Sequence, residues 1–175
     1  MSKYAKKRRE VSDDTQPAQS TPEGIGTPSS EGPMQSDAKA QTQRKCVLVV
    51  DDERDYRTII ERQLDSDYEI YAAQNGSEAL SVLVWMYGEG KPPAVIITDQ
   101  MMPIMDGDEF IAKVRKITKG LRFIMITSNT DITMDTLVPG GKPDRLIYKT
   151  DLLGSNGLQK AVTDLLGEQR GAQEE

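Results

Sequence analysis

The sequence contains no histidine and only one cysteine, Cys46, among its 175 residues. The absence of histidine removes the commonest general base and metal ligand of proteins, and with it any catalytic triad of serine, histidine and aspartate. A single cysteine excludes an internal disulfide framework and a cysteine-rich zinc site. Chemistry in this protein therefore has to use carboxylates, hydroxyl groups and lysine.

Long hydrophobic runs are lacking as well, because the longest uninterrupted apolar stretch is the six-residue segment Val82–Tyr87. A transmembrane helix needs about 20 mostly apolar residues, so no membrane insertion is predicted. No apolar stretch follows the basic start of the chain, which argues against a secretory signal peptide. We therefore expect a cytoplasmic protein.

The first 45 residues offer little from which a core can be built. Val11 and Ile25 are their only large aliphatic residues, among four prolines, three glycines and ten serines or threonines. So little apolar surface cannot offset the conformational entropy lost on folding, and we predict that residues 1–45 form a disordered tail. Residues 46–175 carry 14 basic and 22 acidic side chains, a net charge of −8. This negative charge argues against direct DNA binding by the folded part, because phosphate contacts dominate such binding.

After this tail, short apolar segments alternate with longer amphipathic ones. Runs such as Val47–Val50 and Val95–Ile97 are apolar at every position, as expected of strands that helices cover on both faces. Apolar residues at helical spacing, for example Leu158, Val162 and Leu165, indicate amphipathic helices between the strands. The predicted strands are Cys46–Val50, Tyr68–Ala73, Ala94–Thr98, Arg122–Thr127 and Arg145–Tyr148. Repeated alternation of strand and helix predicts an α/β fold with an open parallel sheet.

Polar side chains stand where these strands end. Asp51 and Asp52 follow the first strand, Asp99 the third and Lys149 the fifth, and Thr127 ends the fourth. Parallel sheets bind ligands beyond the carboxyl ends of their strands. Carboxylates that meet there repel one another, and Mg²⁺, which prefers oxygen ligands, removes that repulsion. With a lysine charge and a threonine hydroxyl for an anion, the set predicts a phosphoryl-acceptor site in which Asp99 forms an acyl phosphate.

The motifs that contain these residues resemble the receiver domains of two-component response regulators. The resemblance is carried by Val49–Glu53, Thr98–Pro103, Met105–Gly107, Met125–Ser128 and Tyr148–Lys149. It implies a receiver domain over residues 46–167. It also implies a flavodoxin-like, doubly wound sheet of five parallel strands in the order 2-1-3-4-5, with helices on both faces.

The resemblance assigns a role to each acidic residue. Asp51 and Asp52 match the metal-binding acidic pair of the family, and Asp99 matches the phosphoacceptor, which is also a metal ligand. The main-chain carbonyl of Met101 matches the position that completes the Mg²⁺ ligands. The implied cofactor is therefore Mg²⁺.

The resemblance also implies how the phosphoryl group is held and where it comes from. Thr127 matches the residue that binds the phosphoryl group, and Lys149 matches the lysine that pairs with it. The implied donor is a histidine kinase or a histidine phosphotransfer protein.

The sequence departs from the family pattern in the last third of the domain. Thr150 stands where receivers usually have proline after the lysine, and Leu146 occupies the usual aromatic switch position. Tyr148 is the nearest aromatic residue on the same side of that strand. The fourth helix is expected over Asp131–Val138 and limited to two turns, because Pro139–Gly141 stop it.

The second predicted helix contains the apolar stretch Val82–Tyr87 and has no obvious polar face. It is either a core helix of unusual length or a helix that presents an exposed Trp85 to a partner protein.

Residues 168–175 form a short polar tail, which leaves no room for a C-terminal DNA-binding domain. We therefore expect a stand-alone receiver that acts through contact with a downstream protein and is not an enzyme beyond its own phosphorylation and dephosphorylation. A degenerate receiver, which binds a protein without phosphate, stays open as an alternative because of Thr150 and the shortened fourth helix. A phosphatase of the haloacid-dehalogenase type is disfavoured, because Glu53 stands where its second aspartate is required.

Overall fold

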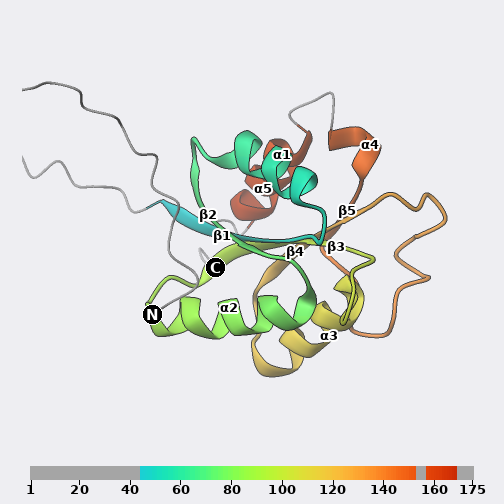
Figure 1. Cartoon of the computed structure of the whole chain (residues 1–175), viewed down its shortest axis with the longest axis horizontal. Helices are drawn as coiled ribbons and strands as arrows, with labels where there is room; N and C mark the ends of the chain where they lie inside the picture. The colour runs from blue at the N-terminus through green and yellow to red at the C-terminus, as the bar shows by residue number, and fades with distance from the viewer. Residues whose placement is uncertain (1–43, 153–156, 169–175) are drawn as a thin grey trace, which may run out of the picture. The chain divides into compact units, whose positions relative to one another are not determined.

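The computed structural model describes residues 44–152 and 157–168, which contain a five-stranded parallel sheet (Figure 1). The strands are β1 (Lys45–Val50), β2 (Tyr68–Ala73), β3 (Pro93–Asp99), β4 (Arg122–Thr127) and β5 (Arg145–Tyr148). Their order in the sheet is β2-β1-β3-β4-β5, and every neighbouring pair is parallel. The predicted α/β class, the doubly wound topology and the strand order are confirmed.

Helices cover both faces of this sheet. They are α1 (Arg54–Leu64), α2 (Gly76–Gly88), α3 (Gly107–Ile117), the short α4 (Lys149–Leu152) and α5 (Gly157–Glu168). In Figure 1, α2 and α3 lie side by side below the sheet, and α1 and α5 lie above it. Among the described residues, no helix combines the length and apolar character needed to cross a membrane.

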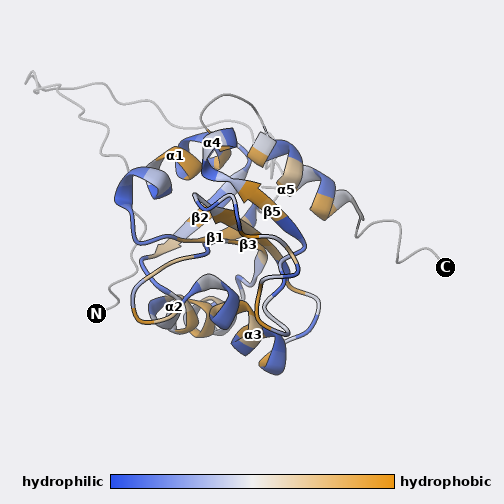
Figure 2. Ribbon diagram, turned by 90° about the vertical axis from the view of Figure 1, so that its right-hand side faces the viewer, coloured by the Kyte–Doolittle hydropathy of each residue, from blue (hydrophilic) through white to orange (hydrophobic). Residues whose placement is uncertain are grey.

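The core forms because strand residues alternate between the two faces. Val47, Val49 and Ile97 pack towards α1 and α5, where α5 contributes Leu158, Val162, Leu165 and Leu166. On the other face, the rings of Phe110 in α3 and Phe123 in β4 meet edge to face, with centroids 6.5 Å apart. Figure 2 shows hydrophobic residues on strands of the sheet such as β3 and β5. This two-sided burial fixes the positions at which the strands end.

The connection between β4 and β5 contains no helix, so the prediction of two helical turns over Asp131–Val138 was wrong. Side chains here bond to nearby backbone groups instead. The amide of Asp131 donates to Asn129 Oδ1 at 2.9 Å, and the amide of Thr133 donates to Thr136 Oγ1 at 3.0 Å. Such local bonds compete with the helical ladder, and Pro139–Gly141 prevents any extension.

The predicted tails fall largely outside the described residues. Of the predicted disordered segment 1–45, only Arg44 and Lys45 are described, and Lys45 already begins β1. Of the predicted tail 168–175, only Glu168 is described, as the end of α5.

Gly107, the first residue of α3, allows that helix to approach the end of β3. A β-carbon at position 107 would collide with the carbonyl oxygen of Asp99 and lie 3.1 Å from Thr98 Oγ1. We expect Gly107→Ala to lower the free energy of unfolding by about 1–3 kcal/mol, as overpacking does, measured by urea denaturation. Gly88→Ala is the control, because a β-carbon there has no atom within 4 Å. Equal stability of the two variants would contradict this packing.

Candidate functional site

Charged side chains from three strand ends meet at the carboxyl edge of the sheet. Asp51 directly follows β1, Asp99 ends β3, and Lys149 directly follows β5. Lys149 Nζ lies 3.0 Å from Asp99 Oδ2 and 3.1 Å from Asp51 Oδ2. All three side chains are buried, with exposed fractions of 3 % for Lys149, 1 % for Asp51 and 8 % for Asp99. The parallel sheet therefore brings together residues that are far apart in the sequence, as predicted.

Lys149 has two further neighbours. Its ammonium donates to Glu53 Oε1 at 3.2 Å and lies 4.0 Å from the centre of the Tyr56 ring. A cation over an aromatic face is attracted by the ring quadrupole. Glu53 occupies the position before α1, and Tyr56 lies in the first turn of that helix. The beginning of α1 thus closes the site around the lysine.

Sequence reasoning did not assign Glu53 or Tyr56 to this site, and it also missed Arg57. Arg57 Nη1 donates to the backbone oxygens of Asp51 and Asp52, at 3.0 Å for Asp52. Glu53, Tyr56 and Arg57 stand three or four residues apart at the start of α1, and residues at that spacing share a helix face. This spacing was the available sequence signal that they act together.

Burial and charge change the pKa of the site's groups. Burial, assisted by the charge of Asp51, raises the pKa of Asp99 from an ordinary 3.8 to about 6, although Lys149 opposes this. Burial also raises the pKa of Asp51, again against the effect of Lys149. Burial by itself lowers the pKa of Lys149, but the hydrogen bond and charge of Asp99, together with the negative charge of Asp51, raise it overall. The site thus holds more negative charge than one lysine neutralises.

The acidic residues fit a hard cation. One carboxylate oxygen each of Asp51, Asp52 and Asp99 lies within 4.8 Å of the others. Asp51 Oδ1 accepts from the Glu53 amide at 2.8 Å. Asp51 Oδ2 is buried and in ion-pair range of Lys149, yet it has no hydrogen bond among the described residues. A buried carboxylate oxygen without a hydrogen bond, beside two other carboxylates, is a suitable ligand for a divalent cation.

The loop after β3 is held in place by backbone contacts. The Gln100 amide donates to Asp99 Oδ1 at 2.7 Å, and the Gly107 amide donates to the Gln100 carbonyl at 2.8 Å. Met101 lies in this loop with its side chain 64 % exposed. The role of the Met101 carbonyl as a metal ligand stays a prediction. The bond to Gln100 leaves the other Asp99 oxygen, Oδ2, for Lys149.

Thr127 ends β4 beside this loop. Asp99 pairs with Ile126 in the sheet, so Thr127 is the next residue along the neighbouring strand. Thr127 is buried, and its hydroxyl accepts a hydrogen bond from the Asn129 amide at 3.0 Å. The Thr127 hydroxyl therefore lies at the sheet edge that also holds Asp99, and its bond to Asn129 links it to the first residues of the β4–β5 connection. Its predicted contact with a phosphoryl group stays a prediction.

The comparisons with known proteins agree with this geometry. The family model for the response regulator receiver domain matches residues 47–150. The chemotaxis protein CheY of Halobacterium salinarum is 38 % identical over 124 residues, which cover 70 % of this chain and 97 % of that protein. The chain belongs to the response regulator receiver family.

Two further relatives match parts of this chain. The sensor histidine kinase TmoS of Ectopseudomonas mendocina is 40 % identical over 76 residues, which cover 43 % of this chain but 7 % of the kinase. The response regulator TrrA of Thermotoga maritima, solved with Mg²⁺ and beryllium fluoride, is 28 % identical with a TM-score of 0.58 over 69 % of this chain and 98 % of TrrA. The chain spans about half or less of the length of the first curated relatives that it matches.

Lys149 is the buried cation that keeps the carboxylates of the receiver together. We expect Lys149→Ala to lower the free energy of unfolding by about 3–5 kcal/mol, because it leaves buried acidic groups without their partner. Urea denaturation measures this change. The control is Lys160→Ala on α5, where the lysine is 75 % exposed and pairs with Asp164 at 2.7 Å; its loss should stay below about 1 kcal/mol. Similar losses in the two variants would refute the role given to Lys149.

The raised pKa of Asp99 predicts a pH dependence of stability. In the metal-free receiver Asp99 binds a proton up to about pH 6, whereas in the unfolded chain it does so only up to its ordinary value of 3.8. Proton binding by Asp99 therefore stabilises the folded receiver fully below pH 3.8, and this stabilisation is lost as the pH rises through about 6. Asp99→Asn cannot ionise, so its stability relative to wild type should increase by about 2–3 kcal/mol between pH 4 and pH 7. Unfolding curves with a chelator present measure the difference.

Asp135→Asn is the matched control for this titration, because Asp135 is 94 % exposed. The change for Asp99→Asn should exceed the change for this control over the same pH range. Equal changes for the two variants would contradict the effect of burial on the Asp99 carboxyl.

Proposed function

We propose that this receiver accepts a phosphoryl group on Asp99 from a histidine kinase or a histidine phosphotransfer protein. The observation that carries the proposal is the contact of a buried Asp99 carboxylate with Lys149, beside Asp51 and Asp52. An electrostatic site of this kind neutralises a transferred phosphoryl group and needs little other protein chemistry. Membership of the receiver family supports it.

The transfer is a displacement at phosphorus. A carboxylate oxygen of Asp99 forms the new O–P bond while the P–N bond to the donor imidazole breaks, and the imidazole leaves with the bonding electron pair. The product is an acyl phosphate. Lys149, now 3.0 Å from Asp99 Oδ2, pairs with the phosphoryl oxygens, and the Thr127 hydroxyl donates to one of them.

We propose Mg²⁺ as the cofactor. Asp51, Asp52, Asp99 and the carbonyl of Met101 would hold it, as the three adjacent carboxylates suggest. When bound, Mg²⁺ supplies positive charge to the phosphoryl oxygens and offsets the repulsion between the carboxylates. The complex of the related TrrA with Mg²⁺ and beryllium fluoride supports this assignment.

We propose that the output is a changed contact with a downstream protein, and that the β4–β5 connection reports the phosphorylated state. The Tyr148 hydroxyl donates to the Ile132 carbonyl at 3.2 Å, and the Asn129 amide donates to Thr127 Oγ1. Both bonds join this connection to residues beside the acceptor, because Tyr148 precedes Lys149. Movement of Thr127 and Lys149 towards a phosphoryl group would change both bonds and reorder the connection. A cytoplasmic location stays a prediction.

The acceptor is tested with acetyl phosphate and Mg²⁺. Wild type should gain the mass of one phosphoryl group, and Asp99→Asn should gain none, because the amide lacks the nucleophilic carboxylate. Asp164→Asn, which removes an exposed carboxylate on α5 outside the site and the β4–β5 connection, should be labelled like wild type. Intact-mass spectrometry at neutral pH measures the adduct, which should be lost on hydrolysis, as acyl phosphates are.

Two results would overturn this function. An acid-stable adduct that persists on Asp99→Asn would place the modification on a serine or threonine. A folded wild type that takes no label from acetyl phosphate or from a phosphorylated histidine donor would instead identify a receiver that binds its partner without phosphate.

A further inference from the structure

The outer side of α2 carries apolar residues that the core does not use. Val84 is 71 % exposed and Tyr87 is 44 % exposed. Trp85, the residue considered for an exposed patch from the sequence, is instead half-buried, and its ring packs against Tyr71 with centroids 5.6 Å apart. The exposed apolar surface of α2 therefore consists of Val84 and Tyr87 and does not include Trp85.

This exposed surface continues onto α3. The Tyr87 and Thr118 hydroxyls lie 3.4 Å apart, which joins the end of α2 to the residue that follows α3. Ile117, the last residue of α3, extends the stripe of Phe110 and Val114 but is 71 % exposed. Val84, Tyr87 and Ile117 are together called the α2–α3 patch.

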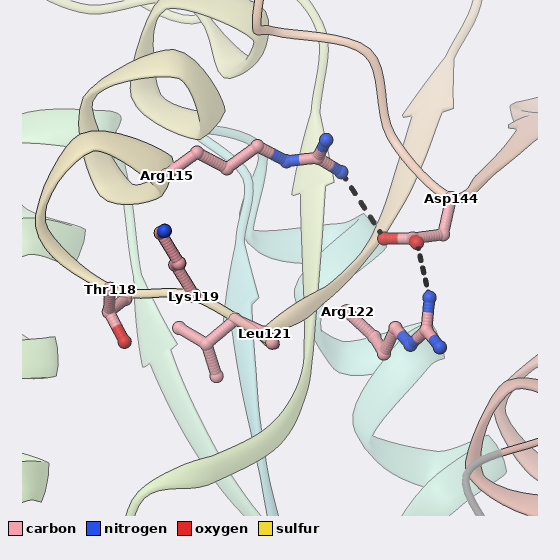
Figure 3. A pocket seen from close by; sticks show the side chains of 7 residues that line it. Arg115, Thr118, Lys119, Leu121, Arg122 and Asp144 are labelled. Atoms are coloured by element: carbon pink, nitrogen blue, oxygen red, sulfur yellow. Dashed lines mark hydrogen bonds and ion pairs between the residues drawn. The ribbon is translucent and has the colours of Figure 1, made fainter. Parts of the chain in front are cut away.

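A basic pocket begins where this patch ends. It has a volume of about 310 Å³ and is lined by the segment from Thr118 to Arg122 together with Arg115 and Asp144. Figure 3 shows Arg115 and Arg122 reaching Asp144 from two sides, at 3.4 and 2.9 Å. The Phe123 amide also donates to Asp144 at 2.9 Å, so this aspartate is committed to holding the pocket together.

The pocket has more positive than negative charge. Lys119 is exposed and has no ion-pair partner among the described residues, and each arginine uses one nitrogen on Asp144 and keeps further donors. Arg115, Lys119 and Arg122 line the pocket with Asp144 as its acidic residue, although residues 46–175 carry a net charge of −8. This concentration of positive charge on an acidic domain selects for an anionic ligand.

We propose that the α2–α3 patch and the basic pocket together dock an acidic segment of a partner protein that also carries apolar side chains. Carboxylates of the segment pair with Lys119 and with the free guanidinium donors of Arg115 and Arg122. Its apolar side chains cover Val84, Tyr87 and Ile117, which removes exposed apolar surface from water. A small anion would leave the apolar α2–α3 patch exposed to water. A nucleic acid is disfavoured by the negative charge of the domain and would also leave this apolar patch uncovered.

The position of this surface keeps it separate from the acceptor. Arg122 is the first residue of β4 and Asp144 immediately precedes β5, so the pocket lies at the amino ends of these strands. Asp99 and Lys149 lie at the carboxyl ends. A partner bound here leaves the acceptor open to its phosphoryl donor, and the docking does not depend on the proposed phosphorylation.

The test is selection of short peptides from a random display library on the full chain, followed by fluorescence anisotropy with the enriched peptides. The peptides should contain both acidic and apolar residues. Lys119→Glu and Ile117→Ser change two exposed residues and should each weaken binding by about tenfold, since reversed charge repels the segment and a polar residue no longer packs on it. Matched controls are Lys160→Glu on α5 and Ile104→Ser in the loop before α3, residues that are also exposed; both should bind like wild type.

Amide spectra verify that each variant is folded. Three outcomes would overturn the proposal. Enriched peptides without acidic residues, or with equal affinity for Lys119→Glu, would exclude charge recognition by the pocket. Self-association of wild type that Ile117→Ser abolishes would identify the surface as a contact between two copies of this chain. Inorganic phosphate binding at the pocket, with no peptide enriched, would reduce the site to one for small anions.

Discussion

The contact of the Lys149 ammonium with the carboxylates around it connects the separate parts of this receiver. Asp51, Glu53 and Asp99 lie within 3.2 Å of Nζ, and the Tyr56 ring lies beneath it. These groups come from the ends of β1 and β3 and from the start of α1, so one buried cation links three elements. Burying a lysine is unfavourable unless its charge is paired, and here the carboxylates provide that pairing.

The same contact leaves the site with excess negative charge, and its chemistry follows from that excess. Burial raises the pKa values of Asp51 and Asp99, and Lys149 offsets this only in part, so the carboxylates are short of positive charge. In the proposed function, a divalent cation would relieve this shortage, and a phosphoryl group on Asp99 would give Lys149 a new anionic partner. Because Lys149 follows Tyr148, whose hydroxyl bonds to the Ile132 carbonyl, a shift of the lysine would be passed on to the β4–β5 connection. Charge balance at one site would thus link the proposed phosphorylation to a surface segment.

The sequence predicted the sheet well because its signals are local. Short runs rich in apolar residues indicated all five strands, and β2, β4 and β5 have the predicted bounds. The meeting of Asp51, Asp99 and Lys149 followed from parallel topology alone. The spacing of Glu53, Tyr56 and Arg57 indicates a shared helix face, but it does not indicate that this face meets Lys149 from the distant end of β5. The predicted helix over Asp131–Val138 is absent because of local hydrogen bonds such as that from the Asp131 amide to Asn129 Oδ1. The basic pocket depends on the long-range pairing of Asp144 with Arg115 and Arg122. Contacts between distant segments depend on how those segments pack in the folded protein, and the spacing of residues in the sequence does not reveal this packing.

The most direct test of the account is the amide NMR spectrum of the receiver before and after addition of Mg²⁺ with beryllofluoride, a mimic of the phosphoryl group. The account predicts chemical-shift changes at Asp99, Thr127 and Lys149 that extend through residues 129–143, together with slower hydrogen exchange in that segment. Asp99→Asn should show none of these changes. Shifts that are absent, or that leave Lys149 and the β4–β5 connection unaffected, would contradict the claim that this lysine couples the acceptor to the surface.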